Sequence, residues 1–94
     1  MVTVRAQPKD DGWMCEVRVD LDGAHTIHSV RVSQKDVERW VRGSDRKDVE
    51  SLVARSFDFL LEREPPNAIL ASFDLSVIQR YFPEYDSTFA NKAT

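Results

Sequence analysis

The sequence contains few of the residues from which small catalytic and redox sites are built. In 94 residues it has one cysteine, Cys15, two histidines and three glycines. One cysteine excludes an internal disulfide. Three glycines leave little room for a glycine-rich phosphate loop or a nucleophile elbow. We therefore predict a protein with no cofactor, no bound metal and no catalytic residues.

Long hydrophobic runs are also missing. No window approaches the roughly 18 apolar residues that a membrane span requires, and no apolar segment follows Met1 as it would in a secretion signal. We expect a cytoplasmic protein with no membrane partner. The length fits one domain, which we place at residues 1–85, followed by a flexible polar tail at residues 86–94.

Neither sign of charge dominates the chain. The net charge is −3, with seven Lys/Arg against seven Asp/Glu in residues 1–43 and six against nine in residues 44–94. Nucleic-acid-binding domains are usually strongly basic. The balance therefore lowers the expectation that this protein binds nucleic acid, although a local basic patch remains compatible with it.

Alternating apolar and polar residues predict three strands, at residues 2–6, 13–21 and 24–32. The pair Asp22-Gly23 between the last two favours a type I′ turn, because both central residues of that turn need positive φ. The turn would pair Leu21 with Ala24 and, further along, Cys15 with Val30 and Trp13 with Val32. A one-residue slip would set polar residues against the valines.

Helical periodicity begins after the third strand. Ser33 and Asp36 resemble a capping box for a helix of about two turns. A longer helix is predicted from residue 44 or 45 to Glu64, where Pro65-Pro66 ends it. A short helix is predicted between Asp74 and Pro83. The predicted fold is α+β, a three-stranded antiparallel β-meander with its helices packed on one face, in the order β-β-β-α-α-α.

Seven of the nine aromatic residues lie between Phe57 and Phe89. The runs in this region are Ser56-Phe57, Phe59-Leu-Leu-Glu-Arg-Glu-Pro65, Ile69-Leu70, Phe73-Asp74-Leu75, Ile78 and Tyr81-Phe-Pro-Glu-Tyr85. Together with the strand at Trp13, they resemble a small family of bacterial proteins of unknown function. The resemblance implies a stand-alone bacterial domain and transfers no functional residues. A looser likeness in element order is to antitoxin-type and double-stranded-RNA-binding modules, but a shared fold does not transmit function.

Two pairs of residues raise the question of catalysis or metal binding. Cys15 and His28 would be diagonal neighbours on one face of the hairpin, within reach of a nucleophile and base pair. That face is otherwise apolar, so packing in the core is the stronger interpretation. His25 and His28 leave opposite faces of a strand and cannot share a metal ion. A small enzyme with a Cys/His site is our third hypothesis.

A basic stripe supplies the second hypothesis. It is formed by Arg31, Lys35, Arg39, Arg42 and Arg46, spaced 4, 4, 3 and 4 residues apart. Such a stripe could contact phosphates or an acidic partner, including the chain's own acidic second half. Asp36 and Glu38 interrupt the charge, and no exposed aromatic residue is interleaved for base stacking. A solvated helix face is the stronger interpretation of the stripe.

The aromatic segment supplies the first hypothesis. Phe59 is out of phase with the apolar stripe that contains Phe57, and Tyr81, Phe82 and Tyr85 flank the end of a short helix. Aromatic residues of this kind form interface cores, and small domains often bury them in a twofold dimer. Burial inside the chain is the alternative. We predict a non-catalytic interaction or regulatory module with a protein partner, most simply a second copy.

Overall fold

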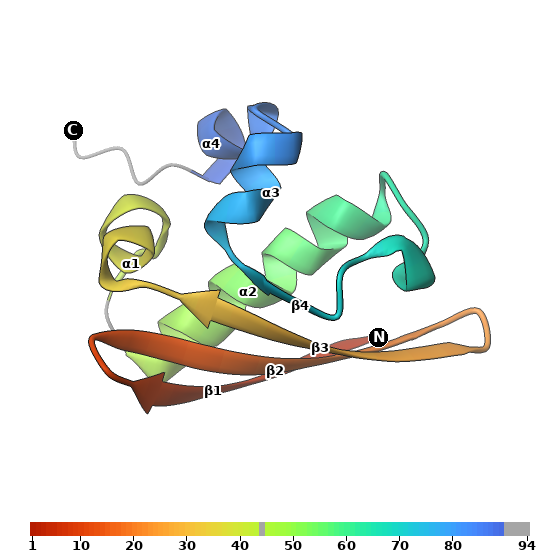
Figure 1. Ribbon diagram of the computed structural model, residues 1–94, viewed down its shortest axis with the longest axis horizontal. Helices are drawn as coiled ribbons and strands as arrows, with labels where there is room; N and C mark the ends of the chain where they lie inside the picture. Colours follow the sequence, from red (N-terminus) through yellow and green to blue (C-terminus); the bar gives the residue numbers. More distant parts are fainter. Residues whose placement is uncertain (44, 90–94) are drawn as a thin grey trace.

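The computed structural model describes residues 1–43 and 45–89. Within these residues the strands form a four-stranded mixed sheet in the order β1-β2-β3-β4, and the helices cover one face of it (Figure 1). The strands are β1 Val2–Lys9, β2 Gly12–Leu21, β3 Ala24–Val32 and β4 Ser72–Asp74. The first three form the predicted antiparallel meander, while β4 pairs in parallel with β3. The α+β fold is confirmed, and β4 is an addition to it.

The turn between β2 and β3 has the predicted geometry. Asp22 and Gly23 have φ values of 52° and 83°, and Leu21 lies opposite Ala24. The register continues to Cys15 opposite Val30 and Trp13 opposite Val32, as the apolar pattern requires. The valines of both strands therefore share one buried face of the sheet.

Strand β1 is longer than predicted, because the chain remains extended through Pro8 to Lys9. Backbone groups in an antiparallel pair point alternately toward and away from the partner strand. The Met1 carbonyl accepts a hydrogen bond from Asp20, so even-numbered residues of β1 direct their backbone groups away from β2. Pro8 is one of these residues, and its missing N–H costs the sheet no hydrogen bond.

Helix α1 spans Gln34–Trp40 and helix α2 spans Arg46–Leu61. The predicted capping box is present at Ser33 and Asp36, and a second box joins Asp45 and Asp48. Helix α2 ends before the predicted Glu64. The amide groups of Arg63 and Glu64 both donate to the Leu60 carbonyl, which closes the helix in a final turn ahead of the prolines.

The C-terminal third contains the predicted short helix, which is α3, and a further helix, α4, that the sequence pattern does not predict. A 3-10 turn, η1, spans Pro66–Ala68, and helices α3 and α4 span Ser76–Tyr81 and Glu84–Phe89. Residues 86–89, which the sequence assigns to the expected tail, form part of α4. Phe89 packs there against Phe59 and Tyr85. The rest of that expected tail, residues 90–94, lies outside the described residues.

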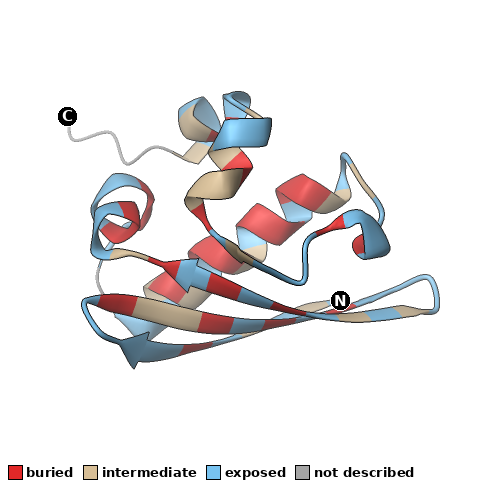
Figure 2. Cartoon of the chain, viewed as in Figure 1, coloured by how far each residue is buried: buried red, intermediate tan, exposed pale blue. Residues whose placement is uncertain are grey.

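Helix α2 lies between the sheet and the last two helices, and buried residues recur along its length (Figure 2). Toward the sheet, Phe57 contacts the rings of His28 and Phe73. On another side, Phe59 contacts Phe82 and residues of α4. The two aromatic residues therefore stabilise different layers of the same core. No helix in residues 1–43 or 45–89 is long and apolar enough to cross a membrane.

Candidate functional site

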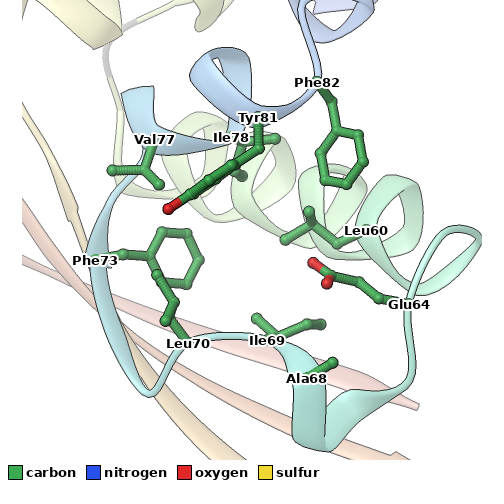
Figure 3. A pocket seen from close by; sticks show the side chains of 10 residues that line it. All are labelled: Leu60, Glu64, Ala68, Ile69, Leu70, Phe73, Val77, Ile78, Tyr81 and Phe82. Carbon is green, nitrogen blue, oxygen red and sulfur yellow. The ribbon is translucent and has the colours of Figure 1, made fainter.

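An apolar groove opens between the C-terminal end of α2, the segment from η1 to β4, and helix α3 (Figure 3). Its volume is about 440 Å³, which is within the range of sites that hold a small molecule or several side chains of a partner protein. Residues from all three segments line it: Leu60, Glu64, Ala68, Ile69, Leu70, Phe73, Val77, Ile78, Tyr81 and Phe82.

The chain after Pro65 forms one wall of the groove. The η1 turn directs Ile69 into the core, where it is 6% exposed, and leaves its neighbour Leu70 52% exposed. Two hydrogen bonds attach this wall to β3. His28 Nδ1 donates to the Leu70 carbonyl at 2.7 Å, and the Ser29 amide donates to the Ala71 carbonyl at 2.7 Å.

Helix α3 forms the opposite wall. Val77, Ile78 and Tyr81 recur at helical spacing and line the groove together. Ile78 is buried and anchors the helix, whereas Tyr81 is 69% exposed at the rim. The groove therefore has a fixed apolar floor and two large, accessible side chains, Leu70 and Tyr81, at its edges.

Glu64 is the charged residue of the lining. Figure 3 shows its carboxylate directed across the mouth of the groove. Within the part of the chain that the structure describes, Glu64 makes no ion pair and no side-chain hydrogen bond. The groove thus presents an apolar surface and one uncompensated negative charge.

Few side chains in the lining of the groove are polar. Its lining has no cysteine, serine or histidine that could serve as a nucleophile or base. Elsewhere in the described residues, no group of three or more His, Cys, Asp and Glu side chains is arranged to hold a metal ion. Tyr81 and Glu64 are the polar groups available to orient a bound partner.

Cys15 and His28 lie on the same face of the hairpin, as predicted, and both are buried beneath the helices. Burial, and then the negative charge of Glu50, raise the pKa of the Cys15 thiol to about 12, so the thiol stays protonated at neutral pH. His28 donates from Nδ1 to the Leu70 carbonyl, and its Nε2 lies 2.9 Å from the Thr26 hydroxyl. Both side chains therefore act as parts of the core.

The other histidine lies apart from this pair. His25 is exposed near the end of the hairpin and contacts the carboxylate of Asp20. Since its neighbours Ala24 and Thr26 point toward the helices, His25 points away from them and from His28. The structure therefore places the two histidines on opposite faces of β3.

The four aromatic residues predicted to bind a partner have different environments. Phe59 is 7% exposed and Tyr85 is fully buried, because α4 folds back onto α2 and stacks its rings on Phe59. The guanidinium of Arg63 lies 3.6 Å from the centre of the Phe59 ring and covers it further. Burial within the chain removes Phe59 and Tyr85 from any accessible surface. Phe82 is half-buried in the groove, and Tyr81 is exposed beside it.

The basic stripe is divided in the structure. Arg39 forms an ion pair with Asp86 at 2.9 Å and lies over the ring of Trp40, so it contacts the chain's own acidic second half. Arg31 lies on β3 between the buried residues Val30 and Val32, and therefore points to the open face of the sheet. The remaining members, Lys35, Arg42 and Arg46, are exposed. The five residues do not form one continuous positive face.

Comparison of the chain with protein-family models, with curated proteins and with solved structures gave no match. The interpretation of the groove therefore depends on its geometry. Sequence reasoning identified Tyr81 and Phe82 but missed the wall at Ile69 and Leu70. The missed signal is that two adjacent large apolar residues in a short turn cannot both point into one core, so one of them must be exposed.

Proposed function

We propose that this protein is a non-catalytic interaction module that binds apolar side chains of a partner protein in the groove between α2, η1 and α3. The observation that supports it most is the position of Leu70 and Tyr81, which are more than half exposed at the rim of a groove of about 440 Å³. Large apolar side chains clustered around a concave apolar surface are typical of protein-binding sites.

The expected gain in free energy agrees with this proposal. Complete burial of a leucine side chain contributes about 1.5–3 kcal/mol, so covering the exposed half of Leu70 contributes roughly 1 kcal/mol. Tyr81 offers a larger area and a hydroxyl that can remain at a wet rim. A partner that fills the groove and covers both residues would gain several kcal/mol, which is enough for a specific transient complex.

Nucleic-acid binding ranks second. Arg39 is paired with Asp86, and Arg31 points to the open face of the sheet, so the predicted basic stripe is divided. Retention of nucleic acid on filters at low salt, lost in an Arg42→Ala variant, would favour this alternative over the groove. A Cys/His enzyme ranks third, because both residues are buried and the thiol is protonated.

The proposal can be tested with a library of displayed peptides selected against the immobilised protein. The protein is attached at low density, so that copies do not meet. We expect selection of peptides rich in large apolar residues. Their binding should fall at least tenfold with Leu70→Glu or Tyr81→Glu, a loss of about 1.4 kcal/mol or more.

Ile27→Glu is the matched control. Ile27 is an apolar side chain that is 58% exposed on the open face of the sheet, so the control has the same charge change on the opposite side of the molecule. Peptides that bind Ile27→Glu as well as the unmodified protein support the groove. Failure to select any peptide sensitive to Leu70→Glu or Tyr81→Glu would refute the proposal.

A further inference from the structure

Two charged side chains beside the groove have no partner in the described chain. Glu64 is one of them, and Arg80 of helix α3 is the other, since neither forms an ion pair or a side-chain hydrogen bond there. Arg63, the neighbour of Glu64 in the chain, is by contrast paired with Glu62 and Glu84. The groove is therefore accompanied by one unpaired negative and one unpaired positive group.

These two groups lie toward different sides of the groove. Arg80 follows Val77 by three residues, so the helical repeat places it next to Val77 on the surface of α3. Figure 3 shows Val77 and Glu64 on opposite sides of the groove. An occupant of the groove would thus meet a negative group near one side and a positive group near the other.

A twofold axis turns this arrangement into a self-complementary one. When two identical surfaces face each other, the axis lies in the plane of contact and sets each side of one surface against the other side of its copy. Glu64 of one chain then faces Arg80 of the second chain, and the reverse contact forms as well. Leu70 and Tyr81, which protrude beside the groove, supply apolar groups that can fill the groove of the facing copy.

The structure also disfavours the simplest competing route to a dimer, pairing of the exposed β1 edges. On this edge the Ala6 amide donates to the Glu50 carboxylate at 2.9 Å, and Pro8 has no amide proton. Two of the outward-facing positions therefore have no donor to offer an added strand.

Building on the proposed function, we infer that the occupant of the groove is a second copy of this chain. The two copies are related by a twofold axis that places Glu64 of each copy against Arg80 of the other. The apolar contacts of Leu70 and Tyr81 drive the association, and the two reciprocal ion pairs fix its orientation.

Sedimentation equilibrium of the full chain tests this inference through charge reversal. Unmodified protein should show a monomer–dimer equilibrium. Glu64→Arg and Arg80→Glu should each weaken dimerisation about tenfold or more, because each creates two like-charge contacts across the axis. The double variant, which exchanges the two charges, should recover the original affinity to within about threefold. Asp58→Arg, an exposed acid of α2 outside the groove lining, should leave the affinity unchanged.

The outcomes separate this inference from the proposed function. A strict monomer that still selects groove-binding peptides overturns the second copy and leaves the interaction module standing. A strict monomer that selects none overturns both. A dimer insensitive to Leu70→Glu, or a double charge exchange that does not recover, refutes the twofold groove contact. Far-ultraviolet circular dichroism on each variant verifies that it is folded.

Discussion

The buried hydrogen bond between Ser56 of α2 and Tyr85 of α4 links the two layers above the sheet. Ser56 Oγ lies 2.7 Å from the Leu52 carbonyl and 2.7 Å from the Tyr85 hydroxyl, and both side chains are fully buried. A serine hydroxyl has one proton, and the Leu52 carbonyl can only accept. The Tyr85 hydroxyl must therefore donate to Ser56 Oγ.

This direction predicts unequal effects of the two single substitutions. Ser56→Ala leaves the tyrosine proton buried without an acceptor, at a cost of about 2 kcal/mol. The better helix propensity of alanine offsets about 0.5 kcal/mol of this cost. Tyr85→Phe removes the donor but leaves Ser56 bonded to Leu52, and should cost about 1 kcal/mol.

The double variant provides the decisive comparison. Once residue 85 is phenylalanine, Ser56→Ala no longer leaves a buried donor unpaired, so it should change the free energy of unfolding by about 0.5 kcal/mol or less. In the presence of Tyr85 the same substitution should cost about 1.5 kcal/mol. Urea denaturation of the unmodified protein, the two single variants and the double variant measures both values, provided that the free energy of unfolding has the same slope against urea concentration in all four. Additive effects of the two substitutions would refute the assigned hydrogen-bond direction and its role between the layers.

Two further predictions concern the sheet. Since burial raises the pKa of the Cys15 thiol from 9.0 to about 12, the unfolded state loses that proton at lower pH than the folded state. The free energy of unfolding should therefore fall as pH rises from about 9 to about 12, and it should fall less steeply in Cys15→Ala. Denaturant titrations at several pH values measure this, and an equal fall with pH in the two proteins would contradict it. A Cβ at Gly12 would lie 2.2 Å from the Val32 carbonyl oxygen, so Gly12→Ala should lower the free energy of unfolding by about 1–3 kcal/mol. A Cβ at Gly23 would meet open space, although φ there is +83°, so Gly23→Ala should cost only about 1 kcal/mol. Thermal unfolding compares the two variants. A greater loss of stability in Gly23→Ala than in Gly12→Ala would be inconsistent with a steric role for Gly12.

The antiparallel part of the sheet could be predicted from sequence because its determinants are local. The Asp22-Gly23 turn sets the loop, and the alternation around Val17 and Val30 admits only one register. The capping box at Ser33 is similarly contained in four residues. In each case neighbouring residues decide the structure without reference to the rest of the chain.

Strand β4 and helix α4 could not be predicted in the same way. β4 has three residues, too few for alternation to be visible, and it forms because β3 offers an unpaired edge. Helix α4 contains mostly polar residues, and its position depends on Tyr85 and Phe89 reaching Phe59 on α2. These contacts join residues far apart in the sequence, which no local pattern records.

The candidate site depends on the same kind of distant contact. Leu70 reaches the rim of the groove because its carbonyl accepts a hydrogen bond from His28, 42 residues earlier, while Ser29 holds the next carbonyl. The sequence offers His28 as a base for Cys15, but its hydrogen bonds to Leu70 and Thr26 make it a positioning residue for the groove wall. A buried polar residue in an apolar strand face therefore bears on the proposed binding site indirectly: its hydrogen bond holds the backbone of Leu70, an apolar side chain at the rim of the groove.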